Sequence, residues 1–330
     1  MQTINISYKD VSGADTVTPL FETGSVCTIG HFDGMHRGHQ HVIEEMVKTA
    51  REALTPLTSI AITFDRHPRT LFDPTFKAQM LSTVDERRHL LSLTDVDACT
   101  VLQFDRDMAG MTAREFMEKI LVNKLGAKIL LLGYDNHFGK KNPEEGFDDY
   151  VRYGNELGLK VIRCDAVSAF GSRNISSTLV REMLTDGYVA EGAEYLGHPY
   201  SIEGTVVSGF HEGRKLGFPT ANLDVASDKL IPERGVYAVK VRVEGSMLDL
   251  HGMMNIGCRP TYGNNKLTLE TNIFRFKEDI YGKRMRVAFI KRLRREKFFP
   301  SVEELRNQLI LDRINADEAL TDEFFSPLIK

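Results

Sequence analysis

The sequence predicts two domains, an α/β domain followed by an all-β domain. The chain of 330 residues is longer than one hydrophobic core usually serves. In residues 1–186, apolar strand-like runs alternate with segments of helical periodicity, which favours a doubly wound parallel sheet. In residues 187–330, strand-like segments follow one another between glycine, proline and asparagine turns, which favours an antiparallel barrel with a C-terminal helix.

The composition predicts a protein without membrane or nucleic-acid partners. Hydrophobic residues make up 42% and charged residues 27% of the chain. Residues 1–11 lack the features of a signal peptide, and no apolar run approaches about 18 residues. The formal net charge is −4, and we interpret the basic stretch 283–297 as a solvated barrel face or helix approach. The four cysteines form no C-x-x-C pair, so we expect a reduced cytoplasmic protein, a monomer or weak oligomer.

The first half is organised around residues 30–40, GHFDGMHRGHQ. They follow the apolar run 26–29 and precede residues 42–54, in which apolar side chains recur at helical spacing, so the pattern is strand, turn and helix. Backbone N–H groups and the dipole at the start of a helix favour phosphate binding. His36 and His39 lie where their ring N–H groups could reach the same phosphate oxygens. A purely structural role for the two histidines is the alternative.

Further elements complete the parallel-sheet pattern. Thr112 and Glu115 predict the capping box of one helix. Ligands bind beyond the carboxyl ends of parallel strands, so the turn at Gly30 and the loop after Gly133 should converge on one crevice. The expected strands are residues 59–64, 99–104, 129–132 and 160–164, and the expected helices are 84–93, 112–125, 179–184 and 189–196.

Two polar segments are candidates for the same crevice. The loop 133–141 carries Asp135, and Ser177 and Thr178 precede a helix in which Arg181 lies one turn in. The hydroxyls could cap that helix, or the guanidinium could bind a phosphate at the helix start. From the residues alone, a surface loop and a helix cap remain open as alternatives.

The second half contains one informative run, GRKLGFPTAN, at residues 213–222. The Walker pattern G-x-x-x-x-G-K-[ST] does not occur in the sequence. Gly209, Gly213 and Gly217 around Arg214 and Lys215 supply flexible backbone and charge for a polyphosphate. The expected barrel strands are residues 201–209, 236–245, 250–257, 267–276 and 285–294, followed by a helix capped by Ser301 with Glu304.

Three side chains of this half are candidates for phosphoryl transfer. Thr220 and Asn222 would share one face of an extended segment, and their neutral oxygens suit Mg²⁺. Glu270, on the opposite side of its strand from Leu269, could accept a hydroxyl proton as that oxygen attacks phosphorus. The alternatives are a turn end for the first two residues and a solvent-facing position for the glutamate.

These strings resemble two enzyme families. G-x-F-D-G-x-H-x-G-H at 30–39 is similar to the nucleotide-binding signature of the H-x-G-H nucleotidyltransferases, in the form typical of bacterial FAD synthetases. ISSTLVR at 175–181 is similar to their ISST-R-I-R motif, and GYDNHFG at 133–139 to their flavin-side loop. GRKLGFPTAN, NIGCRPTYG at 255–263 and DIYGK at 279–283 resemble bacterial riboflavin kinase.

The chain departs from these patterns at four places. Leu179 replaces the first arginine after ISST, His31 replaces an asparagine, and Asn136 replaces an aromatic residue. The segment FDRHP at 64–68 lacks the first proline of F-E-P-H-P.

The resemblance implies a Rossmann-like FMN adenylyltransferase domain over residues 1–186 and a six-stranded riboflavin kinase barrel over 187–330, acting on riboflavin, FMN and ATP. It implies catalytic roles for Glu270, His36 and His39, with Mg²⁺ at Thr220 and Asn222. In the adenylyltransferase, ATP would bind Gly30, Phe32, Asp33, Gly34, Ser176, Ser177, Thr178 and Arg181, and the flavin would bind Asp135 and Phe138. In the kinase, ATP would bind Gly209, Gly213, Lys215 and Gly217.

Other functions remain open. The departures at 136 and 179 are compatible with a riboflavin kinase whose first domain is degenerate. A class I aminoacyl-tRNA synthetase uses a similar turn, but the sequence has no K-M-S-K-S-like loop. A flavin-binding regulator or RNA-binding module would draw on the basic stretch 283–297 and would not need Glu270.

Overall fold

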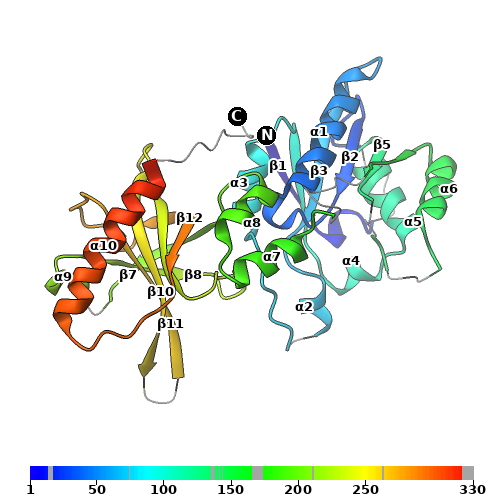
Figure 1. Ribbon diagram of the computed structural model, residues 1–330. Helices are drawn as coiled ribbons and strands as arrows, with labels where there is room; N and C mark the ends of the chain where they lie inside the picture. The colour runs from blue at the N-terminus through cyan, green and yellow to red at the C-terminus, as the bar shows by residue number, and fades with distance from the viewer. Residues whose placement is uncertain are drawn as a thin grey trace. The chain divides into compact units, whose positions relative to one another are not determined.

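The computed structural model describes the chain as two compact units (Figure 1). The first unit comprises Met1–Ala78 and Val84–Ser176, and the second begins at Ser177 and also takes in Gln79–Thr83. The structure describes residues 1–13, 18–73, 75–134, 138–140, 142, 144–165, 174–209, 212–261 and 264–321.

The first unit contains a six-stranded sheet in which every pairing is parallel, in the order β1-β4-β3-β2-β5-β6. This arrangement confirms the doubly wound α/β prediction, because the chain builds outward from β2 in both directions. Strand β1 was not predicted. The strands are β1 (Gln2–Ile6), β2 (Ser25–Ile29), β3 (Thr58–Phe64), β4 (Ala98–Leu102), β5 (Ala127–Leu132) and β6 (Lys160–Arg163).

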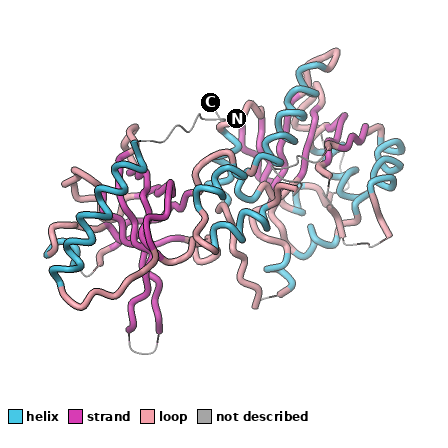
Figure 2. The backbone as a smooth tube through the Cα atoms, in the orientation of Figure 1, coloured by secondary structure: helices cyan, strands magenta, loops and turns pink. Residues whose placement is uncertain are grey.

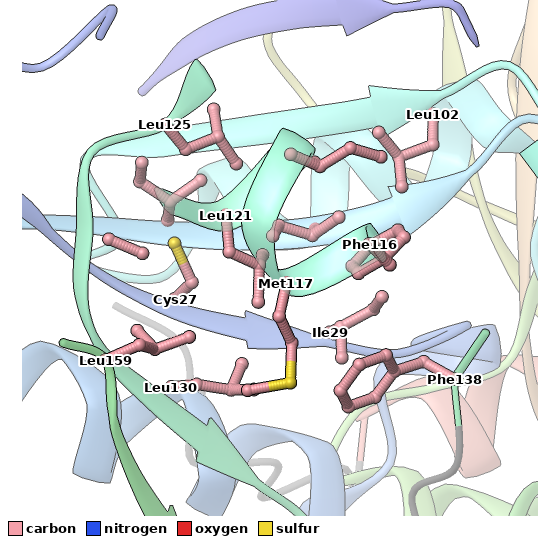
Figure 3. Close-up of a cluster of buried hydrophobic side chains, with 14 of the residues drawn as sticks. Cys27, Ile29, Leu102, Phe116, Met117, Leu121, Leu125, Leu130, Phe138 and Leu159 are labelled. Atoms are coloured by element: carbon pink, nitrogen blue, oxygen red, sulfur yellow. The ribbon is translucent and has the colours of Figure 1, made fainter. Parts of the chain in front are cut away.

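Helices lie against this sheet and bury two separate apolar clusters. One cluster, shown in Figure 3, gathers Cys27, Ile29 and Leu130 of the sheet against Phe116 and Leu121. The helical segments are η1 (Tyr8–Asp10), η2 (Asp33–Met35), α1 (Arg37–Glu52), α2 (Arg69–Phe72), α3 (Val84–Ser92), α4 (Arg106–Gly110), α5 (Ala113–Phe116), the π-helical η3 (Met117–Lys124) and α6 (Phe147–Leu157).

The structure tests two helix boundaries that were predicted from local signals. It confirms one and corrects the other. The backbone N–H of Glu115 donates to the Thr112 hydroxyl (3.2 Å), and the backbone N–H of Thr112 donates to the Glu115 carboxylate (2.9 Å), which confirms the capping box. Helix α1 ends at Glu52, and Leu54 lies beyond it, fully exposed. The inclusion of Leu54 in the helical face was therefore wrong, since Ala53 has already turned to an extended conformation.

The second unit is a closed antiparallel barrel of six strands, in the order β10-β11-β8-β7-β12-β9. In Figure 2 these strands curve around a common centre. The PTAN segment supplies the sixth strand, β8. The elements are α7 (Ser177–Thr185), α8 (Val189–Leu196), β7 (Ser201–Val207), α9 (Glu212–Lys215), β8 (Ala221–Val225), β9 (Gly235–Val243), β10 (Leu250–Thr261), β11 (Asn264–Ile273), β12 (Arg284–Arg294) and α10 (Val302–Thr321).

The barrel buries apolar side chains on both of its faces. Its interior is filled by residues such as Val239, Met254 and Phe289. Alternate residues of the same strands, such as Ala238 and Met253, point outward into a second cluster with residues of α10. Helix α10 runs along the outside of the barrel against β9, β10 and β12 (Figure 1). The Ser301 hydroxyl accepts the Glu304 backbone N–H (3.2 Å), which confirms the predicted cap.

Residues Gln79–Thr83 belong to the second unit although they lie within the first half of the sequence. Met80 forms a parallel bridge with Lys229, and its backbone N–H donates to the Asp228 carbonyl (2.7 Å). The buried ammonium of Lys229 donates to the Leu81 carbonyl (2.6 Å) and lies over the Tyr200 ring. The buried contacts make this short segment an integral part of the second unit.

Candidate active sites

The turn between β2 and α1 lies at the carboxyl edge of the sheet. Strand β2 is flanked by β3 on one side and by β5 on the other, so later parts of the chain lie on both sides of it. Strand β5, which ends before Gly133, pairs directly with β2, so the two loops begin side by side at this edge; their convergence on one crevice stays a prediction. The turn is strained. Phe32 and Met35 have φ angles of 48° and 45°, and Gly34 has 77°. Residues other than glycine rarely adopt this left-handed conformation.

The structure brings His36 and His39 together at the start of α1. Their rings stack with centroids 3.6 Å apart. His36 is the N-cap, and its Nδ1 accepts the backbone N–H of His39 (3.3 Å), so a neutral His36 ring carries its proton on Nε2. The Nδ1 atom of His39 is buried without a hydrogen-bond partner among the residues described.

Burial is the main cause that lowers the pKa of His39 well below its usual value, and the neighbouring His36, His31 and Arg87 add to it. The His39 ring is therefore neutral at pH 7. A neutral imidazole can donate one hydrogen bond to a phosphate oxygen, from the ring nitrogen that carries its proton.

Other predicted residues of the first unit have different surroundings. Phe32 and Asp33 are almost fully buried within the turn, and a side chain at Gly30 would press on the Phe32 ring. Phe138 is 7% exposed and stacks on Tyr150 with centroids 4.6 Å apart.

Figure 3 shows the Phe138 ring beside Ile29 and Met117 in the apolar cluster. Asp135, the other predicted flavin-binding residue, lies outside the described residues, as does Asn136.

The predicted phosphate-binding hydroxyls are divided between the units. Ser176 closes the first unit, whereas Ser177, Thr178 and Arg181 belong to α7 and are described with the second. The Arg181 Nε donates to the Gln79 carbonyl (2.8 Å). Leu179, which replaces the arginine typical of the motif, is buried.

A cavity of about 360 Å³ lies between the barrel and α10, and Glu270 and Thr220 both line it. Glu270 is on the outer face of β11, because its neighbours Leu269 and Thr271 are buried on the inner side. The cavity is lined by Gly213, Leu216, Phe218, Thr220, Val236, Met253, Asn255, Gly257, Cys258, Thr268, Glu270, Asn272, Arg294, Glu296, Lys297, Phe299, Leu305 and Leu309. Most of this wall is apolar, and a few polar groups converge on it, as in small-molecule sites.

Strand pairing assembles the polar groups. Asn222 of β8 and Asn255 of β10 lie directly opposite Glu270 in the two ladders that flank it. Directly paired residues place their side chains on the same face. Two predicted glycines adjoin these groups: a Cβ at Gly213 would lie 3.3 Å from the Thr220 hydroxyl, and one at Gly209 would overlap the Asn222 side chain. A side chain at Gly209 would displace Asn222, and one at Gly213 is excluded chiefly by the Phe218 carbonyl, 2.3 Å from the Cβ position.

A second cavity, of about 400 Å³, lies on the other side of Thr220. Its lining carries two basic side chains, Arg214 and Lys277, together with two acidic ones, Glu278 and Asp279. Lys215, predicted to bind phosphate, is exposed and lines neither cavity. Gly217 has a φ of 84°, which explains why a glycine is needed at this turn.

Several lining residues were missed from the sequence. Of the basic pair Arg214 and Lys215, which the sequence singled out together, the structure places only Arg214 at a cavity. Asn255 begins the NIGCRPTYG run but was given no role, and Lys277 carried no local signal, because only the barrel brings it to the cavity.

The basic stretch 283–297 is partly neutralised within the unit. The Arg284 guanidinium pairs with Glu203 (2.7 Å), and Arg294 forms a fork on the buried carboxylate of Asp312 (2.8 and 2.9 Å). Gln308 also donates to Asp312 (2.9 Å). The Arg294–Asp312 pair fastens α10 to the end of β12 beside the first cavity.

Known proteins resemble this chain along nearly its whole length. A family model for FAD synthetase matches residues 19–179, and one for riboflavin kinase matches residues 196–320. A bifunctional riboflavin kinase/FMN adenylyltransferase of Escherichia coli K12 is 34% identical over 94% of this chain and 97% of its own. The Listeria monocytogenes protein of the same name is also 34% identical, over 93% and 94%.

A solved structure covers the same span. The crystal structure of a macrolide-efflux protein from Streptococcus pneumoniae superposes with a TM-score of 0.82 and 31% identity, over 95% of this chain and 99% of its own. Within the described part of this chain, no helix is both long enough and apolar enough to cross a bilayer.

Proposed function

Because this chain belongs to the family of bifunctional riboflavin kinases/FMN adenylyltransferases, we propose a specific division of labour between its two candidate sites. The protein is a transferase that uses ATP to convert riboflavin to FMN and FMN to FAD. We assign the kinase to the site beside Glu270 and the adenylyltransferase to the turn 30–39. The corresponding functional division of the chain is 1–186 and 187–330.

The kinase assignment rests on one observation, that two cavities meet at Thr220. The largely apolar cavity beside Glu270 suits the flavin ring, and the cavity with Arg214 and Lys277 suits the nucleotide. The terminal phosphate of ATP and the ribityl hydroxyl of riboflavin would then meet between Thr220 and Glu270. The Glu270 carboxylate takes the proton of that hydroxyl as its oxygen attacks the γ-phosphorus, and ADP leaves.

The surrounding chain would hold the phosphates. Gly209, Gly213 and Gly217 would allow the backbone to approach the phosphates closely. Lys215 stays a predicted phosphate ligand, although it is exposed and lines neither cavity. Neutral oxygens of Thr220 and Asn222 fit Mg²⁺, which prefers oxygen ligands and keeps several waters. When bound, Mg²⁺ would neutralise charge on the transferred phosphate.

The adenylyltransferase needs no general base, because the attacking FMN phosphate is already an anion. It attacks the α-phosphorus of ATP, and pyrophosphate leaves. His36, through Nε2–H, and the neutral His39 would donate to the phosphate oxygens where charge accumulates. Gly30, Phe32, Asp33 and Gly34 would form the backbone of this phosphate site.

The remaining assignments rest on sequence patterns. Ser176, Ser177, Thr178 and Arg181 stay predicted ATP ligands, and Asp135 stays a predicted flavin ligand. For Phe138, its burial supports a structural role, in which the ring anchors the loop to the core of the first unit.

The test is flavin chromatography with the full-length protein, ATP and Mg²⁺. Supplied riboflavin should yield FMN and then FAD. His39→Ala should lower FAD formation from FMN by about 100- to 1000-fold, the usual loss for one preorganised donor, and leave FMN formation intact. Wild-type protein that forms FMN but never FAD would instead identify a riboflavin kinase with a degenerate first domain. His39→Ala with near-normal FAD formation would refute the site at the turn.

A further inference from the structure

Two side chains outside the 30–39 signature, those of Arg87 and Gln40, bind the backbone of the strained turn in the first unit. Arg87 of α3 is 1% exposed, and its Nη1 donates to the His31 carbonyl (2.7 Å) and to the Thr63 hydroxyl (2.9 Å). The Thr63 hydroxyl donates to the same carbonyl (3.1 Å). Gln40 of α1, 9% exposed, donates its Nε2–H to the Met35 carbonyl (2.7 Å).

The two carbonyls bracket the strained residues. His31 directly precedes Phe32, and Met35 is the last residue of the turn with a positive φ. Non-glycine residues in this conformation cost of order 1–3 kcal/mol each and persist only where surrounding contacts hold them. Arg87 and Gln40 fix the first and last peptide groups of the turn, so they supply such contacts.

Fixing a carbonyl also fixes an N–H group. A peptide unit is planar and trans, so its N–H points away from its C=O. With the His31 carbonyl held toward Arg87, the Phe32 N–H points the opposite way. The Met35 carbonyl, held by Gln40, likewise fixes the direction of the His36 N–H, at the residue that caps α1.

We propose that Arg87 and Gln40 are positioning residues for adenylyl transfer, which orient the backbone N–H groups of Phe32 and His36 toward the phosphates of ATP. Arg87 is buried and acts through the His31 carbonyl rather than on the substrate. Its positive charge also lies near the phosphate site, where it adds to the favourable field. The inference rests on the proposed role of the turn 30–39 in FAD formation.

The experiment uses full-length protein carrying Arg87→Met, which keeps side-chain length and removes charge and donors. With enzyme in large excess over FMN, the single-turnover rate constant of FAD formation does not depend on the fraction of folded enzyme. We expect this rate constant to fall by about 10- to 100-fold, the loss typical of a displacement near 1 Å in a reacting site. Arg87→Lys, which keeps one donor, should recover part of it. Riboflavin kinase activity of the same samples should not change.

A matched control separates positioning from stability. Ser59 lies on β3 like Thr63, is fully buried, and donates its hydroxyl to Asp97 (2.6 Å) near the opposite end of the strand. Ser59→Ala should lower the thermal unfolding temperature and leave the rate constant unchanged. An equal fall in Ser59→Ala, or an unchanged rate constant in Arg87→Met, would overturn the proposal.

Two further variants keep the result decisive. If Arg87→Met does not fold, Gln40→Leu, which removes the donor to the Met35 carbonyl, should show a fall of about 10-fold or more, and an unchanged rate constant would overturn the proposal. His39→Ala tests the underlying function independently. Loss of FAD formation in His39→Ala with normal rates in Arg87→Met and Gln40→Leu would refute the positioning role and leave the proposed function intact.

Discussion

The turn at residues 30–39 is one continuous stretch of backbone, whereas the site beside Glu270 is assembled from three separate strands, β8, β10 and β11. Asn222, Asn255 and Glu270 meet only because β8, β11 and β10 pair in one register. The continuous site depends on what holds a strained backbone in place. The assembled site depends on strand register and on the helix that covers it. Different substitutions should therefore impair the two sites.

The largest expected effect is at Glu270, because the assembled site relies on one proton acceptor. Glu270→Gln keeps the size and removes the acceptor charge, and FMN formation should fall by about 100- to 10,000-fold, the usual contribution of a general base. FAD formation from supplied FMN serves as the control in the same protein and should be unchanged. Rates of both steps are read by chromatography. A Glu270→Gln enzyme with more than a tenth of normal FMN formation would show that another group accepts the proton.

The next effect tests the cover of the assembled site. Asp312→Ala leaves Arg294 without its buried partner, and breaking such a pair costs about 3–5 kcal/mol. We expect lower stability in urea and a raised KM for riboflavin, because α10 contributes Leu305 and Leu309 to the cavity wall. FAD formation from FMN should not change.

Asp249→Ala is the matched control for that variant. It breaks an exposed fork with Arg242 on the same barrel, which is worth under about 1 kcal/mol. Equal losses in the two aspartate variants would contradict the idea that α10 is fastened through Asp312.

The smallest effect compares one helix cap from each unit. Thr112→Ala and Ser301→Ala should each cost about 1 kcal/mol of stability, since each hydroxyl caps one helix. Neither helix start carries a residue assigned to catalysis, so both rate constants should stay normal. A selective loss of FMN formation in Ser301→Ala would show that the position of α10 is more sensitive to its first turn than to Asp312.

Much of both folds could be predicted because periodicity and turn signals are local. The strands β2 to β6 follow apolar runs, and the caps at Thr112 and Ser301 follow the four-residue spacing of capping patterns. Strand β1 was not predicted from the sequence because its five residues, Gln2–Ile6, include polar side chains at the partly exposed edge of the sheet. Its pairing with β4 is a long-range contact with no local signature.

The site residues likewise divide into those with a local sequence signal and those without one. His36 and His39 could be identified because the whole turn is contiguous, and Thr220, Asn222 and Glu270 because they resemble a known pattern. Arg87 and Arg294 could not, because each acts through a contact with a distant residue, His31 in one case and Asp312 in the other. A charged residue on an amphipathic helix looks the same in sequence whether it faces water or a buried carbonyl.

The segment Gln79–Thr83 has a consequence for the order in which the protein forms on the ribosome. Leu81 and its partner Lys229 are 148 residues apart. At about 5–20 residues per second, synthesis leaves Leu81 without that partner for roughly 7 to 30 s. During this interval the flanking residues of the first unit can already fold, so the segment must wait as an open strand between finished pieces. A pause in translation before residue 229 would lengthen the time for which this segment is accessible to a protease or a chaperone.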